Sequence, residues 1–298
     1  MLSIKVCYLT MYSLNDFECY DSLTFIPMGS LGYFVSEVSW QANVDWNDYD
    51  YVVIRSPWDY QDHADKFLNV LKIIDASSAT LLNPLSIVSW NINKTYLADL
   101  QKSNVPIVPT IFSKNLTIDQ LESAYTNFDV TEIVVKPTIS ANADDTFRIP
   151  KTELNEFIFR HIEKFQNREC MLQPFVPAIV SEGEYSLFYF DGDLSHCILK
   201  TPKSGDFRVQ EEHGGRLKLI ESPDSRLLIS GKQALKAIPE TLLYARLDFV
   251  RFQGDFVLME AELIEPSLYF NMDPESPARF AKAFDDYHND RISNSKHQ

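Results

Sequence analysis

The sequence predicts an α/β protein that begins with a parallel sheet and ends with mainly antiparallel strands. In the N-terminal part, strand-like runs at residues 4–9 and 49–55 alternate with an amphipathic helical pattern at 62–74. Such alternation is typical of βα units, which build parallel sheets. From Glu184 onward most of the chain has a strand-like pattern, followed by a helix near 277–287.

A smaller lobe is predicted between these two parts. After a break at Leu82-Asn83-Pro84, residues 86–102 have a helical pattern, and the strand-like run 132–136 stops at Pro137. A second helix is expected over about 152–166. The predicted parts are an N-terminal α/β domain at 1–85, a small lobe at 86–172, an antiparallel C-terminal lobe at 173–288 and a frayed polar tail at 289–298.

Composition excludes several classes of function. The chain has 298 residues and a net charge of −15, with 27 lysines and arginines against 42 acidic residues, which argues against a nucleic-acid partner. No apolar run approaches the roughly 18 residues of a membrane helix, and the N-terminus lacks the features of a signal peptide. The four cysteines have neither metal-type nor disulfide-type spacing. We therefore expect a cytoplasmic protein without a membrane span.

Three acidic residues near the end of the chain are the strongest sign of function. Asp248 lies in one strand-like run, Glu260 and Glu262 lie in the next, and Gln253-Gly254-Asp255 separates the runs, so a β-hairpin is predicted. In the second strand, alternation places Glu260 and Glu262 on one face with Phe256, Leu258 and Ile264, and places Val257, Met259, Ala261 and Leu263 on the other. An odd-length loop would bring Asp248 onto the acidic face.

Carboxylates that share a face in this way need compensation. At about 4 Å each pair repels by about 4 kcal/mol at an effective dielectric constant near 20. A cation is therefore expected among them, unless some are protonated. Oxygen ligands favour Mg²⁺ or Mn²⁺ over Zn²⁺. A solvated strand face with surface salt bridges is the alternative interpretation.

Basic residues mark a second group of candidates. Lys136 ends an apolar strand and precedes a loop of small residues, where backbone N–H groups can cradle phosphates while the ammonium group supplies charge. A snorkelling surface lysine would give the same pattern. Lys94, near the start of a helix, is less specific. Arg55 follows a predicted parallel strand at its C-terminal end, where α/β sheets place ligands, and is a candidate for contacting an acceptor substrate.

Together these motifs resemble the ATP-grasp superfamily of carboxylate ligases. The resemblance covers about two-thirds of the chain in the family's order. Its motifs are Asn93-Lys94, Val135-Lys136-Pro137, Gln173-Pro174-Phe175-Val176, Glu182-Gly183-Glu184, Asp206-Phe207-Arg208, Asp248 and Glu260-Ala261-Glu262. The glutathione-synthetase and ribosomal-protein glutamate-ligase branch is nearest, in particular the subgroup of the D-cycloserine-forming ligase, to which residues 53–60 and Trp90-Asn91 are similar.

The resemblance implies an ATP-grasp fold, in which an N-terminal parallel α/β domain is followed by two lobes that sandwich ATP. It assigns the α/β-phosphates to Lys94 and Lys136, and the adenine edge to the main chain of Phe175 and Val176 with Gln173 alongside. Glu184 would accept the ribose hydroxyls. Ser140 and Ala141 belong to the phosphate loop, where Ser140-Ala141-Asn142-Ala143 replaces the family's glycine-rich sequence.

The same resemblance implies the metal and the reaction. Asp248, Glu260 and Glu262 would hold one or two Mg²⁺ ions, with Mn²⁺ as an alternative. Arg208, and less directly Lys200, would stabilise charge on an acyl phosphate. The expected activity is an ATP-dependent, ADP-forming ligase that joins a small carboxylate to an amine-type acceptor, and homo-oligomerisation stays open. The rival class is a nucleotide-binding sensor or scaffold without turnover, which ADP release would distinguish.

Overall fold

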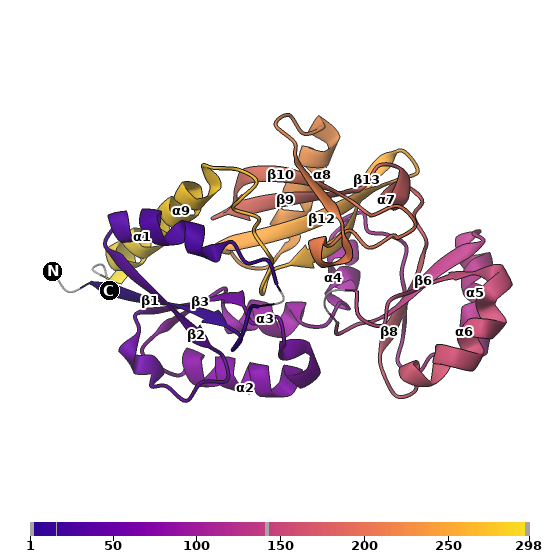
Figure 1. The fold of residues 1–298 in the computed structure, drawn as a ribbon, viewed down its shortest axis with the longest axis horizontal. Helices are drawn as coiled ribbons and strands as arrows, with labels where there is room; N and C mark the ends of the chain where they lie inside the picture. Colours follow the sequence, from indigo (N-terminus) through magenta and orange to yellow (C-terminus); the bar gives the residue numbers. More distant parts are fainter. Residues whose placement is uncertain (1–2, 16, 141–142, 296–298) are drawn as a thin grey trace.

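A computed structural model describes residues 3–15, 17–140 and 143–295 of the chain (Figure 1). The N-terminal part is a parallel sheet in the order β2-β1-β3-β4, which confirms the predicted parallel architecture. Its elements are β1 (Ile4–Thr10), η1 (Asp21–Thr24), α1 (Phe25–Ser30), β2 (Tyr33–Ser39), η2 (Trp46–Asp48), β3 (Tyr51–Ser56), η3 (Tyr60–His63), α2 (Ala64–Asp75) and β4 (Thr80–Leu82), where η marks a short 3₁₀ helix. Strand β3 is buried throughout because helices and a second sheet cover its two faces.

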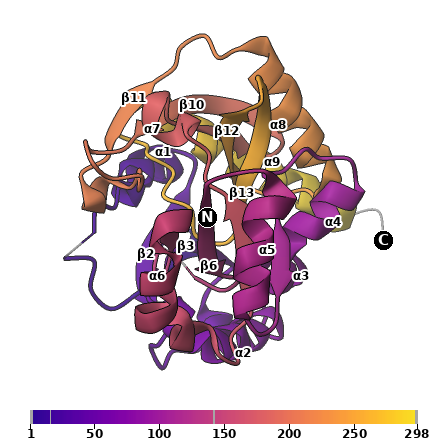
Figure 2. The same cartoon turned by 90° about the vertical axis from the view of Figure 1, so that its right-hand side faces the viewer.

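The small lobe holds an antiparallel sheet in the order β5-β8-β6-β7. Its elements are β5 (Ile111–Ser113), α5 (Ile118–Phe128), β6 (Glu132–Pro137), β7 (Phe147–Pro150), η4 (Lys151–Glu153), α6 (Leu154–His161), η5 (Ile162–Phe165) and β8 (Cys170–Pro174). Thr117 and Gln120 form a capping box that starts α5. Figure 2 looks onto this lobe and shows α5 and α6 outside strand β6, so the lobe has a hydrophobic core of its own.

The C-terminal part is an antiparallel sheet in the order β11-β10-β9-β12-β13, as the sequence predicts. We call it the large sheet. Its elements are α7 (Ala178–Ser181), β9 (Glu184–Phe190), β10 (Asp193–Thr201), η6 (Glu211–His213), β11 (Arg216–Leu219), α8 (Ser225–Ala237), β12 (Tyr244–Phe252) and β13 (Asp255–Glu262). The predicted hairpin is therefore β12 and β13, at one edge of this sheet.

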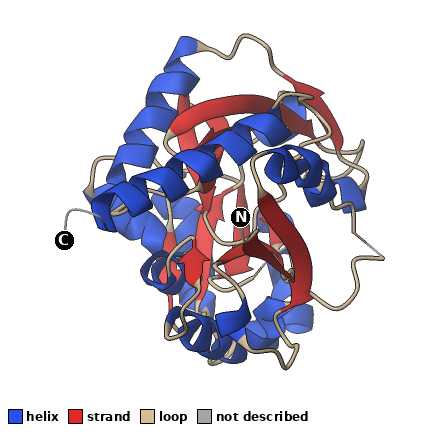
Figure 3. Ribbon diagram, turned by 90° about the vertical axis from the view of Figure 1, so that its left-hand side faces the viewer, coloured by secondary structure: helices blue, strands red, loops and turns tan. Residues whose placement is uncertain are grey.

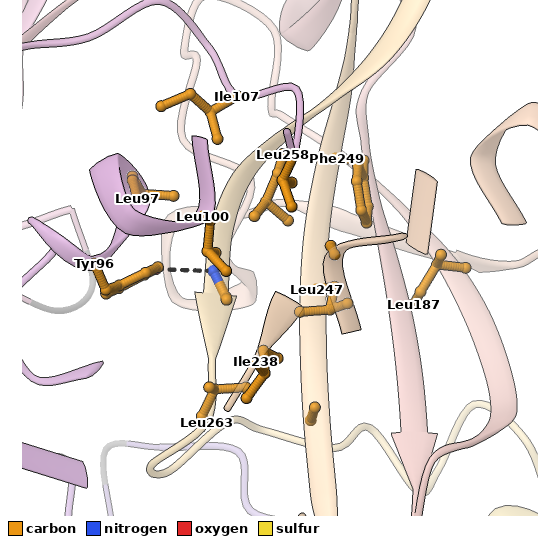
Figure 4. Packing of buried hydrophobic residues seen from close by; sticks show 14 of the residues in the cluster. Tyr96, Leu97, Leu100, Ile107, Leu187, Ile238, Leu247, Phe249, Leu258 and Leu263 are labelled. Atoms are coloured by element: carbon orange, nitrogen blue, oxygen red, sulfur yellow. Dashed lines mark hydrogen bonds between the residues drawn. The ribbon is translucent and has the colours of Figure 1, made fainter. Parts of the chain in front are cut away.

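Two short helices replace the single helix predicted over 86–102. They are α3 (Leu85–Asn91) and α4 (Tyr96–Lys102), and Lys94 lies in the break between them. Leu97 and Leu100 pack on the large sheet beside Leu258, as Figure 4 shows. The expected small lobe begins at residue 86, but neither helix joins the core of that lobe. Helix α4 packs in the core of the large sheet, and α3 contributes Ile87 to that core and Val88 to the core of the N-terminal domain.

The C-terminal helix α9 (Ser276–Ser295) corrects the expectation of a frayed tail from residue 289. The helix continues through 289–295 and packs beside α1 (Figures 1 and 3). Tyr33 donates a hydrogen bond to Asp285 at 2.6 Å, and the Tyr51 hydroxyl lies 2.7 Å from His288 Nδ1. Phe280 and Phe284 complete a core shared by the N-terminal sheet and the large sheet. In the part of the chain that the structure describes, no helix is long and apolar enough to span a membrane.

Candidate active site

A cavity of about 210 Å³ lies where the three parts of the molecule meet. Residues predicted from the sequence supply much of its lining: Lys94, Lys136, Ser140, Gln173, Phe175, Val176, Glu184, Arg208, Glu260 and Glu262. Arg55, Lys200 and Asp248 are outside the described lining, and Ala141 lies outside the described residues. The sequence motifs therefore converge, although three of the expected residues stand away from the cavity surface.

The hairpin brings Asp248 next to Glu260 as predicted, but a β-bulge rather than the predicted odd-length loop is the cause. Its turn has two residues, Gln253 and Gly254, with φ of 52° and 92°, as a type I′ turn requires. A β-bulge then shifts the register, so Asp248 pairs with Glu260 and Met259 has no partner on β12. The bulge, rather than an odd-length loop, makes Asp248 the direct neighbour of Glu260.

The bulge also reverses the expected faces of β13. Phe256 and Leu258 join the core behind the sheet, in which Ala261 also lies, whereas Met259 lines the cavity with Glu260 and Glu262. The predicted alternation was therefore wrong for the residues before the bulge. An extra residue in one strand exchanges the faces of all residues on one side of it.

Strand β13 is an edge strand, and side chains from α3 and α4 satisfy its outer backbone groups. Asn91 donates to the Ala261 carbonyl at 2.9 Å and accepts from the Leu263 N–H at 3.1 Å. The Tyr96 hydroxyl accepts from the Ala261 N–H at 2.8 Å, the dashed contact in Figure 4. These bonds hold the backbone on both sides of Glu262 and so limit where the acidic side chains can point.

The three acidic residues are compensated by cations of the protein itself. Asp248 is buried and accepts hydrogen bonds from Arg246 at 3.1 Å and from Ser186, and it lies 3.3 Å from Lys200 Nζ. Arg246 also pairs with Glu262, and Lys94 Nζ lies 3.1 Å from Glu260. Among the described residues, no group of three or more acidic, histidine or cysteine side chains is arranged to hold a metal ion. In this structure the three carboxylates instead belong to one network of ion pairs, and their role as metal ligands stays a prediction.

Burial and these cations shift the pKa values in opposite directions. Burial raises the pKa of Glu262 to about 8, and the charges of Asp248 and Glu260 add to the effect against the opposing charge of Arg246. For Glu260, burial is outweighed by Lys94 and Lys136, so its pKa is lowered. Burial lowers the pKa of Lys136. Arg246 and Lys200 likewise outweigh burial at Asp248 and lower its pKa, so the network favours the ionised form of both Glu260 and Asp248.

Arg246 is a functional residue that the sequence reasoning missed. It stands two positions before Asp248 on β12 and therefore faces the same side of the strand. Its guanidinium joins Asp248 to Glu262 and lines the cavity. The spacing Arg246-Leu247-Asp248 was the available signal, because a basic residue at that spacing can compensate acids on the same face.

Glu184 and Lys200 form a buried ion pair across β9 and β10. Burial lowers the pKa of Lys200, but the charges of Asp248 and Glu184 outweigh it and the pKa is raised. Burial raises the pKa of Glu184 against the charge of Lys200. Lys200, expected to stabilise an acyl phosphate, instead holds two acidic side chains in place.

The side of the cavity expected to receive adenine is apolar and partly preformed. The Phe175 N–H donates to the Glu132 carbonyl at 3.0 Å, so it is already used within the small lobe. Val176 N–H has no hydrogen-bond partner among the described residues. Gln173 donates to Thr110 Oγ1 at 2.9 Å, and the Arg148 guanidinium lies 3.7 Å from the centre of the Phe175 ring. Of the main-chain groups of Phe175 and Val176 that are expected to meet the base, the Phe175 N–H is thus already used, whereas the Val176 N–H still offers a donor.

Two basic residues in the cavity have acceptors nearby. Arg208 forms two-pronged hydrogen bonds with Asp206, the closest of them at 2.8 Å. Lys94 donates to the Ser140 carbonyl in addition to its ion pair with Glu260. Both cations are thereby held in position rather than left mobile in solvent.

Arg55 does not have the position expected of a residue that contacts substrate. It is almost fully buried, its Nη2 lies 2.9 Å from Asp21, and it donates to the Pro266 carbonyl at 3.0 Å. Its guanidinium also lies 4.9 Å from the centre of the Tyr244 ring. Arg55 therefore connects the N-terminal domain to the segment that follows β13.

Comparison with known proteins identifies relatives over both the N-terminal part and the rest of the chain. A family model for the prokaryotic glutathione synthetase ATP-grasp domain matches residues 96–266, and a model for the N-terminal domain of D-cycloserine synthetase DcsG matches residues 6–83. The cycloserine biosynthesis protein DcsG of Streptomyces lavendulae is 29% identical over 273 residues, which cover 85% of this chain and 89% of that protein. A glutathione synthetase of Prochlorococcus marinus (strain MIT 9313) is 23% identical over 67% of this chain and 61% of its own length.

Solved structures show the same fold. The crystal structure of D-cycloserine synthetase DcsG has a TM-score of 0.81 and 26% sequence identity, and the match covers 94% of this chain and 98% of that one. D-alanine–D-alanine ligase from Bacillus anthracis, complexed with ATP, has a TM-score of 0.66 and 15% identity, with 95% of both chains covered. At that identity the likeness concerns the fold alone.

Fold and site together define an ATP-grasp enzyme, a ligase of the ADP-forming carboxylate–amine class. The chain belongs to the prokaryotic glutathione synthetase ATP-grasp family, and its N-terminal residues 6–83 are similar to the N-terminal domain of D-cycloserine synthetase. Both statements confirm the family predicted from the sequence motifs.

Proposed function

We propose that this protein uses ATP to activate a carboxylate as an acyl phosphate and joins it to an amine or similar nucleophile, with release of ADP and phosphate. One observation carries the proposal: Lys94, Lys136, Glu260 and Glu262 line a single cavity between the lobes. Lysines suit phosphate oxygens, and carboxylates suit the Mg²⁺ that accompanies them in phosphoryl transfer.

In this proposal the nucleotide lies between the small lobe and the large sheet. Lys94 and Lys136 bind its phosphates, and Ser140 lines the cavity with them. Ala141, which the sequence motif adds to the phosphate loop, lies outside the described residues. Val176 offers its N–H to the base, next to Gln173 and the ring of Phe175. Glu184 accepts the ribose hydroxyls with the lone pairs that its ion pair with Lys200 leaves over.

The donor set fits Mg²⁺, with Mn²⁺ as an alternative, because Mg²⁺ typically takes one or two carboxylates and completes its shell with phosphates and water. Glu260 and Glu262 would supply those carboxylates. Asp248 is already satisfied by Arg246, Lys200 and Ser186, so it would act through the orientation of its neighbours. The metal, when bound, would neutralise charge on the phosphates.

Three basic residues in or near the cavity have separate roles in this proposal. Arg208, fixed by Asp206, has a further N–H group available for negative charge on an acyl phosphate. Arg246 keeps Glu262 in place and lines the cavity beside it. Lys200 is proposed as a positioning residue, because it contacts Glu184 and Asp248 rather than the cavity.

The test is release of ADP by the purified protein with Mg²⁺, ATP and a panel of amino acids, dipeptides and ureido-amino acids. We expect at least one panel member to raise ADP release clearly above the rate with ATP alone. ATP binding without any acceptor-dependent ADP release would instead favour the nucleotide-binding protein without turnover.

A further inference from the structure

The segment that follows β13, residues 264–268, is held by an unusual set of hydrogen bonds. Each main-chain carbonyl of this tethered segment lies within hydrogen-bond distance of a side-chain donor. The Tyr244 hydroxyl lies 2.8 Å from the Ile264 carbonyl and shares its one hydrogen between this carbonyl and that of Ile54. The donors to Glu265, Pro266, Ser267 and Leu268 are Trp58 at 2.8 Å, Arg55 at 3.0 Å, Arg246 at 3.2 Å and His196 Nε2 at 3.1 Å. A backbone tethered at every residue presents its side chains in a fixed geometry.

Trp58 and Arg55 come from the N-terminal domain, so the tethered segment is positioned by both halves of the molecule. Two residues of the motif Arg55-Ser56-Pro57-Trp58-Asp59-Tyr60 therefore hold the main chain of the tethered segment. Glu265 and Ser267 of the tethered segment line the cavity, together with the following Tyr269 and with Trp58 and Tyr60. Such a preorganised wall is typical of a binding subsite.

Glu265 differs from the other acidic residues of the cavity. Among the described residues, four acidic side chains line it: Glu184, Glu260, Glu262 and Glu265. Lys200, Lys94 and Arg246 form ion pairs with the first three. No described lysine, arginine or histidine forms an ion pair with Glu265. A carboxylate that faces a cavity without a cation of its own is suited to a cation brought by a ligand.

The surroundings of Glu265 favour the same kind of ligand. The Tyr60 hydroxyl faces its carboxyl, and Trp58 and Phe17, whose ring centres are 5.5 Å apart, also line the cavity. Aromatic faces attract ammonium groups and add to an ion pair. Burial raises the pKa of Glu265 to about 7, against the opposing effects of the Tyr60 hydroxyl and of the charge of Lys94, which forms its ion pair with Glu260 instead.

We propose that Glu265, flanked by Trp58 and Tyr60, binds the amino group of an amino-acid-like substrate. The inference rests on the proposed ligase function and names the class of small molecule that occupies this end of the cavity. Trp58 and Arg55 act as positioning residues, because they hold the main chain on which Glu265 is carried.

Isothermal titration with D- and L-serine and D- and L-alanine, each paired with its N-acetyl derivative, tests the proposal. The protein is saturated with Mg²⁺ and a non-hydrolysable ATP analogue. Acetylation removes the positive charge while it leaves the carboxylate in place. The variants are Glu265→Gln, which keeps the shape, and Tyr60→Phe, with Glu275→Gln as control, because the Glu275 side chain is 86% exposed.

We expect at least one amino acid to bind wild type and Glu275→Gln ten times or more tightly than its N-acetyl form. Glu265→Gln should lose that preference, Tyr60→Phe should reduce it, and affinity for the ATP analogue should stay within twofold. Absence of binding by every amino acid, equal binding of the N-acetyl forms, or an unchanged preference in Glu265→Gln would each overturn the proposal.

The two proposals fail in different ways. Wild type that shows the Glu265-dependent preference but releases no ADP contradicts the ligase function and leaves the amine subsite in place. Acceptor-dependent ADP release with the same KM in wild type and Glu265→Gln supports the ligase function and removes the subsite.

Discussion

Arg246 on β12 and Glu262 on β13 are direct cross-strand partners, and the same guanidinium also binds Asp248. One cation therefore serves two carboxylates, one of them fully buried. Removal of either side of such a pair leaves an uncompensated charge in a poorly hydrated place.

Replacement of Arg246 by methionine should lower the free energy of unfolding by about 3 kcal/mol, the lower end of the cost of breaking a buried ion pair. Urea unfolding followed by circular dichroism measures it. The matched control is Arg226→Met, because Arg226 is half exposed and pairs only at the surface with Asp224. Equal effects of the two substitutions would contradict the buried role of Arg246.

Removal of Mg²⁺ with EDTA should reduce acceptor-dependent ADP release at least about 100-fold if Glu260 and Glu262 hold the ion against the phosphates. Glu260→Gln should weaken the dependence of nucleotide affinity on Mg²⁺.

Asp248→Asn should mainly lower stability, because Asp248 faces Lys200 and Arg246. Nucleotide titrations at several Mg²⁺ concentrations separate these effects. An Asp248→Asn protein of normal stability that loses its Mg²⁺ dependence would restore the three-carboxylate site expected from sequence.

Lys136→Ala should weaken ATP binding about tenfold or more with little loss of stability. Burial already lowers the pKa of Lys136, so the folded protein gains little from the charge itself. Nucleotide titration and thermal unfolding of the same sample give both quantities. The exposed Lys232 offers a control substitution on α8. A steep drop in Tm with unchanged ATP affinity would make Lys136 a structural residue.

Arg208→Lys should lower kcat by about 10²–10³ while ATP affinity stays nearly constant. A lysine cannot keep the two-pronged contact with Asp206 and still present a donor to developing charge. Steady-state ADP release with a cognate acceptor measures kcat, and nucleotide titration measures affinity. Parallel losses of kcat and ATP affinity would instead show that Arg208 binds the nucleotide.

Acidification should destabilise the protein through His196. Burial lowers its pKa from 6.5 to about 4, so the unfolded chain binds the proton more tightly and stability falls as pH decreases through this window. Between pH 7 and pH 5 the loss from this group is about 2 kcal/mol. Chemical unfolding at both pH values in wild type and His196→Gln isolates the contribution. An identical pH dependence in the two proteins would exclude it.

The sequence was sufficient to predict the fold class, the hairpin that carries the acidic residues, and Lys94 and Lys136 as residues of the cavity. Each of these predictions depends on residues that are close together in the chain. The sequence was insufficient for the bulge in β13. Both faces of β13 carry apolar side chains. Phe256 and Leu258 pack in the core behind the sheet, whereas Val257 and Met259 pack in a smaller apolar cluster on the other side. Period-two alternation therefore could not identify the face that meets the cavity.

Long-range partners explain the other differences. Arg55 was placed correctly at the end of a strand, but Asp21 and Pro266, which bind it, lie 34 and 211 residues away in the chain. Glu265 lies in none of the motifs that the sequence analysis identified. Its importance depends on tethers from Trp58, Tyr244 and His196, which only the folded chain brings together.

The core that α9 completes has a mechanical consequence. Since Phe280 and Phe284 join the N-terminal sheet and the large sheet, those two parts should move as one rigid body. The small lobe has its own core, and the chain enters and leaves it near residues 106–110 and 174–177, which contain Pro106, Pro109, Pro174 and Pro177. Opening of the cavity should therefore be a swing of the small lobe about two proline-stiffened chain crossings, with the end of the cavity that Trp58, Tyr60 and Glu265 line left undisturbed on the rigid side.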